Sequence, residues 1–508
     1  MEFHNTSEKS VFWEIHVFNE NNYKERKLMN HMQHQSTIPN TSRKNGKYIY
    51  RYFCMLILAV VATSIFLYFW LKFINRLGNE DMLPPGSFSL RGIGNIGMAL
   101  GIFFVLYITI GTWLHAFTIG VERKANILAA QVLTLFTTAF FEIFVSCAVS
   151  GQFRYVFEFL KMYSIMFVIQ TIICCLVCLP MIDIYRKVFP PLRIIEIYGD
   201  YTNNLVSKIN AIKYKYSVVD RISCHEDEKV IRERIRAYDA VLLNDLPAHE
   251  ENRCLKICFE AHRRVYFVPK ISDILVKNSE ELNLIDAPLF LNRNNGIGPI
   301  QRFVKRFFDI FLSLFTLIVF SPIFIIVAAA IHLEDGGPVF FKQERVTIGE
   351  KRFMILKFRS MIVDAEKDGR PHPAGEKDDR ITKVGRIIRA CRVDELPQLI
   401  NILKGDMSIV GPRPERWEHV VKYSEDIPEF NFRHSVKGGL TGYAQVYGKY
   451  NTTALDKLKL DLLYITNFSI LLDLQIIFET VKILVQKEST EGFTEDKQAE
   501  MHDSVKNG

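Results

Sequence analysis

Four long apolar runs in the N-terminal part constrain this chain more than any other feature of its sequence. They cover residues 50–74, 94–120, 126–149 and 160–182. Each run reaches the roughly 20 residues that an α-helix needs to cross the hydrocarbon core of a bilayer. We therefore predict four transmembrane helices over residues 47–187.

The composition is that of a chain combining membrane segments with soluble domains. Hydrophobic residues make up 49% of the 508 residues, yet 23% are charged. The net charge of +7 is modest and suits a face near anionic lipid or phosphate ligands; we expect no nucleic-acid partner. The nine cysteines have the spacing of neither a zinc site nor a disulfide framework, which indicates a reducing compartment.

The charges around the apolar runs favour cytoplasmic ends for the bundle. Basic residues precede the first run, separate the second from the third and follow the fourth: Arg43, Lys44, Lys47, Arg51, Arg123, Lys124, Arg186, Lys187 and Arg193. Residues 1–46 are polar and contain no apolar core, so we predict a disordered cytoplasmic tail rather than a signal peptide. Residues 489–508 form a second polar tail.

Residues 188–295 have the composition of a soluble domain. The stretches "RIIEIYG", "AVLLND" and "RRVYFVP" are typical of buried strands, and helical patterns lie between them. This alternation predicts a small, Rossmann-like parallel α/β domain. The turn after the first strand reads "GDYTNN" and lacks the glycine spacing of a dinucleotide site. A structural or regulatory domain is the better interpretation.

Residues 300–335 contain a fifth apolar run, for which an ordinary membrane span is the default interpretation. However, Ser321 and Pro322 lie in its middle, where proline bends a helix. Each arm of roughly 14 residues then reaches only about 20 Å, less than a hydrocarbon core of about 30 Å. The run is also basic on both sides. These features predict a re-entrant membrane helix, with Lys305 and Arg306 at the lipid headgroups.

The segment 336–488 is basic and glycine-punctuated, and it ends in amphipathic helices. Its first cluster contains "FMILKFRSM", where alternation suggests a strand on which cations such as Lys357 and Arg359 share an environment. A solvated basic edge strand explains the same pattern.

The second cluster, "GRIIRACRVDELPQL", brings arginines close to two adjacent carboxylates. A carboxylate near Arg389 and its neighbours should stay ionised, so Asp394 could be a nucleophile. Glu395 points elsewhere on the backbone and could hold a divalent cation through oxygen. An Asp-Glu pair is equally typical of the first turn of a helix. The pattern alone leaves both interpretations open.

Two further clusters are rich in glycine. In "LKGDMSIVGPRPE", two prolines hold Arg413 in a stiff frame, where a guanidinium suits a phosphate; a tight turn is the alternative. The stretch "VKGGLTGYAQVYGKYN" carries Gln445 in another glycine-rich loop. Together, the clusters and the broken membrane helix suggest phosphate chemistry at a bilayer surface.

Residues 302–486 resemble the bacterial polyprenyl-phosphate sugar-1-phosphate transferases, the monotopic phosphoglycosyl transferases. The resemblance runs in order through "KRFFD", the mid-helix "SP", "KFRSM", "DELPQLINILKGDMSIVGPRPE", "GLTGYAQVYG" and "LDLLYITNFSILLDLQIIFET". The four spans and the α/β domain are similar to the long form of that family, which initiates exopolysaccharide, capsule or O-antigen synthesis. The implied fold is a membrane protein of the α plus α/β class, with a four-helix transmembrane bundle, a Rossmann-like domain, a re-entrant helix and a mixed α/β catalytic domain with interfacial amphipathic helices.

The resemblance implies transfer of a sugar-1-phosphate from a UDP-sugar to undecaprenyl phosphate with release of UMP. Asp394 would form a phosphosugar-aspartate, and Glu395 would coordinate Mg²⁺ or Mn²⁺. The residues that would bind the substrate are Arg389, Arg413, Lys357, Arg359 and Gln445. The resemblance also implies a multi-pass protein of the bacterial inner membrane with a cytoplasmic catalytic domain, and it admits a homodimer.

The sequence departs from the family pattern at three places. Thr347 stands where the pattern has Gly, Gly438 stands where "K-P-G-L-T-G" has Pro, and "CRVDEL" has an uncommon lead-in. An alternative to the enzyme is a catalytically inactive membrane scaffold of a polysaccharide assembly complex. The intact Asp394, Glu395 and Arg413 argue against that alternative. A transporter is disfavoured because the four spans carry few charges.

Overall fold

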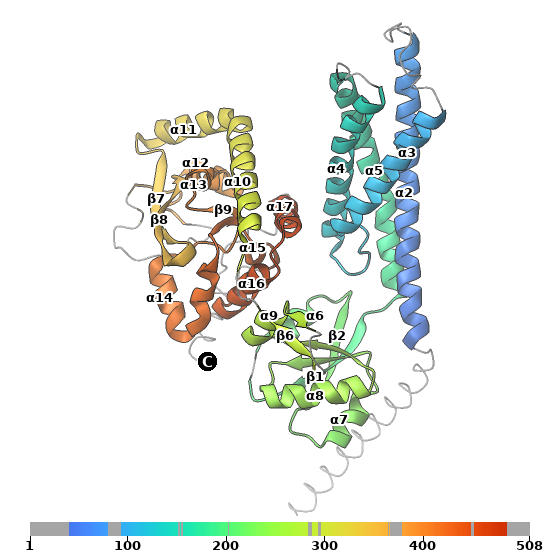
Figure 1. Cartoon of the computed structure of the whole chain (residues 1–508), viewed down its shortest axis with the longest axis vertical. Coiled ribbons are helices and arrows are strands. Elements are labelled where there is room, and N and C mark those ends of the chain that lie inside the picture. The colour runs from blue at the N-terminus through green and yellow to red at the C-terminus, as the bar shows by residue number, and fades with distance from the viewer. Residues whose placement is uncertain are drawn as a thin grey trace, which may run out of the picture. The chain divides into compact units, whose positions relative to one another are not determined.

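The computed structural model describes residues 40–79, 93–150, 153, 156–201, 203–282, 287–292, 296–363, 365, 378–448 and 452–484. The chain forms two compact units that divide between Phe267 and Val268 (Figure 1), and each is described by itself. Most of the predicted N-terminal tail and all of the predicted C-terminal tail lie outside the described residues. The last residues of the N-terminal tail, from Asn40, begin the first described helix.

Four helices in the first unit are long and apolar enough to cross a membrane, which confirms the predicted spans. They are α2 (Asn40–Asn79), α3 (Ile93–Trp113), α4 (Lys124–Ser150) and α5 (Val156–Val188). Their shared core is rich in aromatic side chains, and the rings of Phe66 and Phe103 stack with centroids 4.5 Å apart. Many other large apolar side chains face outward, as expected of helices surrounded by lipid.

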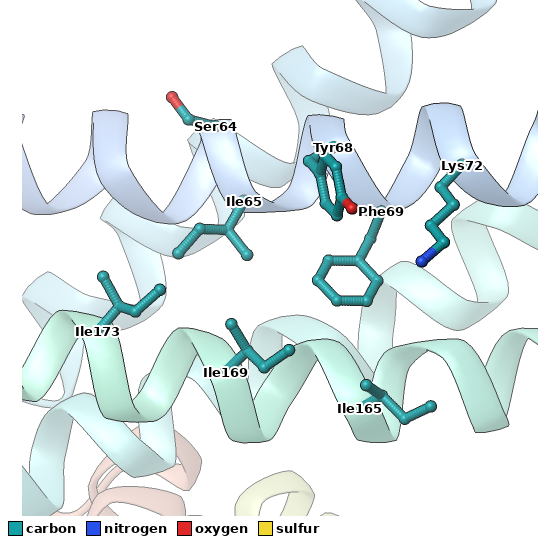
Figure 2. A pocket seen from close by; sticks show the side chains of 8 residues that line it. All are labelled: Ser64, Ile65, Tyr68, Phe69, Lys72, Ile165, Ile169 and Ile173. Carbon is teal, nitrogen blue, oxygen red and sulfur yellow. The ribbon is translucent and has the colours of Figure 1, made fainter.

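An open groove lies between α2 and α5 on the bundle (Figure 2). It is lined by Ser64, Ile65, Tyr68, Phe69, Lys72, Ile165, Ile169 and Ile173. Isoleucine and aromatic side chains make most of its wall, and the ammonium of Lys72 lies 6.0 Å from the centre of the Tyr68 ring. Such a wall suits an acyl chain better than a polar substrate.

The rest of the first unit is a four-stranded parallel sheet with strand order β2-β1-β3-β4, as the alternation of strands and helices predicts. Its elements are β1 (Leu192–Tyr198), α6 (Leu205–Asn210), β2 (Tyr216–Ser223), α7 (Glu228–Ile235), β3 (Ala240–Asn244), α8 (Ala248–Glu260) and β4 (Arg264–Phe267). At the carboxyl ends of β1 and β3, Asn244 donates to Glu196 at 2.8 Å and is bonded to Asn203. These polar groups are satisfied by one another, in keeping with a structural role.

The second unit begins with α9 (Ile271–Val276) and the hairpin of β5 (Glu280–Leu282) and β6 (Leu289–Leu291). The sequence analysis grouped these residues with the α/β domain. In the structure, Ile274 of α9 is instead buried against Leu458 and Leu462 of α16 (Ala454–Thr466). The remaining described elements of this unit carry the four sequence clusters on short strands and helices rather than on one large sheet.

Those elements are α10 (Pro299–Val319), α11 (Ser321–Asp335), β7 (Phe340–Val346), η2 (Ile348–Glu350), β8 (Arg352–Phe358), α12 (Lys383–Ala390), η3 (Val393–Glu395), α13 (Gln398–Lys404), β9 (Ser408–Val410), α14 (Trp417–Asp426), η4 (Pro428–Ser435), β10 (Gly439–Thr441), α15 (Tyr443–Tyr447) and α17 (Ile470–Leu484). The strands β7 and β8 pair antiparallel, and β9 and β10 pair parallel. Small helices around two short strand pairs make a mixed α/β domain.

The helix pair α10 and α11 is bent by 63° at the predicted position (Figure 1). Ser321 and Pro322 begin α11, and the Ser321 hydroxyl donates to the carbonyl of Ile318 at 2.8 Å. The α10 arm has 21 residues, more than the roughly 14 expected, because the helix begins at Pro299 within the polar flank. Together the two arms would count as a fifth span if they crossed the membrane; a re-entrant path stays a prediction.

Candidate active site

Asp394 and Glu395 lie in the 3₁₀ turn η3, which separates α12 from α13. The residue before this turn, Arg392, has a left-handed backbone with φ of 56°, uncommon for a non-glycine residue. This conformation ends the preceding helical segment and turns the chain before the carboxylates. Because α13 begins only at Gln398, the two acids precede that helix instead of occupying its first turn.

Glu395 joins three segments that are far apart in the sequence. Its Oε1 atom accepts a hydrogen bond from the Lys357 ammonium of β8 at 3.0 Å. The same oxygen accepts another from the Arg413 guanidinium, also at 3.0 Å. Both bonds are charge-assisted, so the pair of cations holds this carboxylate in one place.

The electrostatic environment keeps the Glu395 carboxylate ionised. Burial alone would raise the pKa of Glu395, but the charges of Arg413 and Lys357 outweigh it and hold that pKa well below its ordinary value. The charge of Glu395 in turn raises the pKa of Arg413. Burial lowers the pKa of Lys357 even though Glu395 lies beside it. The resting site is therefore a compact ion cluster.

Asp394 has a different environment from its neighbour. Burial and the charge of Glu395 raise the pKa of Asp394, while Lys357, Arg389 and Arg392 act in the opposite direction. The net direction is the reverse of what the nearby arginines alone would produce. Within the described part of the chain, the Asp394 carboxylate has no hydrogen bond or ion pair, so its oxygens are available to react.

The segment that carries Arg413 is held at each of its carbonyl groups. The carbonyl oxygens of residues 412–415 accept hydrogen bonds, in order, from the Gly439 N–H at 2.8 Å, the Arg433 guanidinium at 3.0 Å, the Arg345 guanidinium at 3.2 Å and the Val346 N–H at 3.0 Å. Two prolines restrict the same backbone. This rigid mounting places the Arg413 side chain beside Glu395.

A small, narrow hollow opens next to the ion cluster. It is lined by Arg345, Ile355, Lys357, Gln398, Arg413, Pro414 and Gly439. Three of these side chains are cations, which suits a phosphate-bearing ligand. Burial lowers the pKa of Arg345 to about 10, so its guanidinium remains charged at neutral pH. Arg345 belongs by sequence to the same basic cluster as Lys357 and Arg359, but neither Arg345 nor Gln398 was among the predicted substrate-binding residues.

Two predicted substrate-binding residues lie away from the hollow. Arg359, which follows β8 and is buried, forms an ion pair with the partly exposed Asp335 at the end of α11 and so joins the end of β8 to the membrane helix pair. Gln445 donates to the carbonyl of Leu440 at 3.3 Å and supports the loop after β10. A third, Arg389, lies on α12 and does not line the hollow either, but its charge lowers the pKa of Asp394.

The basic residues of α10 have protein partners. Lys305 donates to the Asp473 carboxylate at 2.6 Å and to the Val410 carbonyl at 2.9 Å. Arg306 donates to two carbonyls, at positions 402 and 403, near the C-terminal end of α13. Asp309, one turn further on, accepts from the Ser408 hydroxyl and from the backbone N–H of residue 409. The "KRFFD" motif therefore fixes α10 to α13, β9 and α17.

The oxygen donors fit a divalent cation that is shared with a substrate. Among the described residues there is no group of three or more His, Cys, Asp or Glu side chains that could hold a metal. Glu395 uses only Oε1 for its two cations, which leaves Oε2 free of hydrogen bonds in the described structure. Mg²⁺ commonly binds through one or two carboxylates together with substrate phosphates.

Comparison with known proteins identifies the family of the second unit. A family model described as bacterial sugar transferase matches residues 300–487. The chain is 40% identical to the UDP-N-acetylgalactosamine-undecaprenyl-phosphate N-acetylgalactosaminephosphotransferase of Aeromonas hydrophila, over 49% of the chain and 59% of that protein. It is 42% identical to the UDP-glucose:undecaprenyl-phosphate glucose-1-phosphate transferase of Klebsiella pneumoniae, over 43% of the chain and 48% of that protein.

The chain thus matches about half the length of these two relatives. A third relative, the UDP-glucose:undecaprenyl-phosphate glucose-1-phosphate transferase of Caulobacter vibrioides, is 40% identical over 37% of the chain and 73% of that protein. This last match covers most of its relative at high identity. The chain belongs to the bacterial sugar transferase family.

Proposed function

We propose that this protein transfers a sugar-1-phosphate from a UDP-sugar to undecaprenyl phosphate and releases UMP. The observation that carries the proposal is the Asp394 carboxylate, which has no hydrogen bond in the described part of the chain and adjoins Glu395, whose two ion partners, Lys357 and Arg413, line a hollow. The names of the relatives, which are sugar phosphotransferases acting on undecaprenyl phosphate, support the choice of substrates. The step would initiate synthesis of an exopolysaccharide, capsule or O-antigen.

The proposed chemistry proceeds in two displacements at phosphorus. An Asp394 oxygen attacks the β-phosphorus of the UDP-sugar, and the bond from that phosphorus to the bridging oxygen breaks, so UMP leaves with the bonding electrons. A phosphate oxygen of undecaprenyl phosphate then attacks the phosphosugar-aspartate and releases the Asp394 carboxylate. Lys357, Arg413 and Arg345 would stabilise the negative charge that develops on the leaving UMP.

A divalent cation has a defined place in this proposal. The second carboxylate oxygen of Glu395 would hold Mg²⁺ or Mn²⁺ together with the substrate phosphates. When bound, the ion neutralises diphosphate charge. The Lys357 and Arg413 contacts to Oε1 orient Glu395 for this task.

The location of the site suits a lipid substrate. Apolar side chains on α10 and α11 are widely exposed, among them Phe307, Phe311, Ile318 and Ile325. We propose that this helix pair enters and leaves one leaflet, which would keep the hollow beside the headgroups of the bacterial inner membrane. The catalytic unit would then be cytoplasmic, where UDP-sugars are made.

The first test measures UMP release from UDP-sugars by purified protein with undecaprenyl phosphate and Mg²⁺. We expect release with at least one sugar, and a loss of at least about 10³-fold in Asp394→Asn, because the nucleophile is removed. Asp379→Asn, an exposed acid outside the site, is the matched control. Intact-mass measurement should detect a phosphosugar adduct that Asp394→Asn lacks. Equal activity of wild type and Asp394→Asn would refute the nucleophile and favour the inactive scaffold.

A further inference from the structure

Two residues that are distant in the sequence, Thr347 and Gly438, meet beneath the segment that carries Arg413. Thr347 follows β7 and its residue is only 5% exposed. Its hydroxyl donates to the carbonyl of Asp406 at 3.0 Å and accepts the N–H of Gly438 at 3.1 Å. The carbonyl of Gly438 accepts from the N–H of Ser408 at 2.9 Å. One hydroxyl therefore ties together the chain entering β9 and the chain entering β10.

Gly438 also sets how closely the chain entering β10 approaches the Pro-Arg-Pro segment around Arg413. A Cβ atom at position 438 would lie 2.6 Å from Cγ of Pro414, closer than such atoms can approach. The ring of Pro414 would have to move, and Pro414 is joined directly to Arg413. The absence of a side chain at Gly438 is thus part of how Arg413 is placed.

A proline at position 438 would be incompatible with these contacts. A proline nitrogen has no hydrogen and carries a ring carbon about 1.5 Å away. That carbon would point along the line to the Thr347 hydroxyl, which is only 3.1 Å from the nitrogen of Gly438. A proline at 438 and a threonine at 347 therefore exclude each other, whereas a glycine at 347 leaves room for the ring.

We propose that Thr347 and Gly438 are a coupled pair of positioning residues that sets the place of Arg413 in the hollow. Neither side chain reaches the hollow, whose wall contains Arg413, Pro414 and Gly439. The pair acts through Pro414 and through the contact of Gly439 with the carbonyl of residue 412. The activity arm of the test rests on the proposed transfer function, and its stability arm does not.

The first part of the test compares two substitutions of Thr347. Thr347→Val keeps the shape and removes the hydroxyl, so the N–H of Gly438 loses its partner and Arg413 shifts. We expect the KM for the UDP-sugar to rise about tenfold, the equivalent of one buried hydrogen bond. Thr347→Ser keeps the hydroxyl and should stay within about twofold of wild type. The KM for undecaprenyl phosphate should be unchanged in both variants.

The second part is a double-mutant cycle. Gly438→Pro alone should lower kcat/KM by about 100-fold or more, because the ring meets the Thr347 hydroxyl and Pro414. Adding Thr347→Gly should recover at least about tenfold of that loss. The same rescue should appear in the thermal unfolding midpoint, a readout that holds even if no UDP-sugar is turned over.

Three results would overturn the proposal. One is an equal KM for the UDP-sugar in Thr347→Val and Thr347→Ser. Another is a lowered unfolding midpoint and kcat in Thr347→Val with an unchanged KM, since that describes a purely structural role. The third is a cycle in which the effects of the two substitutions simply multiply. If Gly438→Pro does not fold, the comparison of valine with serine at 347 still decides. Absence of UMP release from wild type with every UDP-sugar would refute the proposed function instead.

Discussion

At the scale of single residues, the adjacent carboxylates of Asp394 and Glu395 have different surroundings. Glu395 receives two cations on one oxygen, and their charges hold its pKa well below the ordinary value. Asp394 receives no hydrogen bond from the described residues, and burial beside Glu395 raises its pKa. Neighbouring acids whose pKa values are pushed apart are typical of sites that divide two tasks between them. Under the proposed function, the division would be between a nucleophile, Asp394, and a charged metal ligand, Glu395, that its two cations orient.

The electrostatics of Asp394 predict how activity depends on pH. The attacking carboxylate must be ionised, so kcat/KM should fall as the pH drops through its pKa. The charge of Arg389 lowers that pKa. Removing this charge in Arg389→Gln makes ionisation harder, so the acid limb of the profile should move to higher pH. Activity on the plateau should also fall about tenfold if Arg389 binds phosphate.

The matched control for this profile is Arg386→Gln. Arg386 lies on the same helix, one turn further from the carboxylates, roughly 4.5 Å along the axis. Its removal should move the acid limb less. If the acid limb stays in place in Arg389→Gln, or moves equally in both variants, then the ionisation that controls the rate is not that of Asp394.

At the scale of elements, α10 is the support on which the catalytic segments are mounted. Its Lys305 pairs with Asp473 of α17, its Arg306 caps α13, and its Asp309 holds the start of β9. The dyad turn η3 precedes α13, and the Arg413 segment follows β9. Helix α10 thereby holds α13, which follows the turn with Asp394 and Glu395, and β9, which precedes the segment with Arg413.

The Lys305–Asp473 pair should contribute measurably to stability. The side chains are 10% and 13% exposed, and the charged atoms lie 2.6 Å apart. Lys305→Met leaves a buried carboxylate without its cation, so the free energy of unfolding should fall by about 3 kcal/mol. The double variant Lys305→Met/Asp473→Asn should lose less than the sum of the two single variants. Thermal unfolding of protein in nanodiscs measures the cycle.

An exposed pair of the same unit provides the comparison. Glu344 and Arg352 are 3.5 Å apart with side chains about half exposed, at 48% and 47%. Glu344→Gln should therefore change stability by about 0.5 kcal/mol or less. If the effects of Lys305→Met and Asp473→Asn add without coupling, the pair does not anchor α10.

At the scale of the whole molecule, the family match and the compact second unit coincide. The match covers residues 300–487, which lie entirely within the unit that begins at Val268. The ion cluster, the hollow and the broken helix pair are all built from residues of this unit.

This arrangement predicts that the second unit retains activity without the first. Protein beginning at Val268 should release UMP in lipid nanodiscs with a kcat within about tenfold of the whole chain, because its binding contacts remain. The same fragment carrying Asp394→Asn is the control. A folded fragment that binds membranes but releases no UMP would show that the first unit takes part in the reaction.

Local pattern was enough to predict a large part of this protein. The lengths of apolar runs predict the four membrane helices, and alternating strand and helix patterns predict the parallel sheet. The Ser321–Pro322 dipeptide predicts the bend between α10 and α11. Each of these is a pattern of residues that are close together along the chain, so the sequence carries the signal directly.

Only the tertiary structure decided which side chains meet. Lys357 on β8 and Arg359 just after it are two residues apart, yet Arg359 pairs with Asp335 and Lys357 with Glu395. Lys305, expected at lipid headgroups, pairs with Asp473, more than 160 residues later. Thr347 and Gly438, which appeared as separate departures from a pattern, share one hydrogen bond. Such contacts depend on how distant segments pack, and spacing along the chain contains no record of that packing.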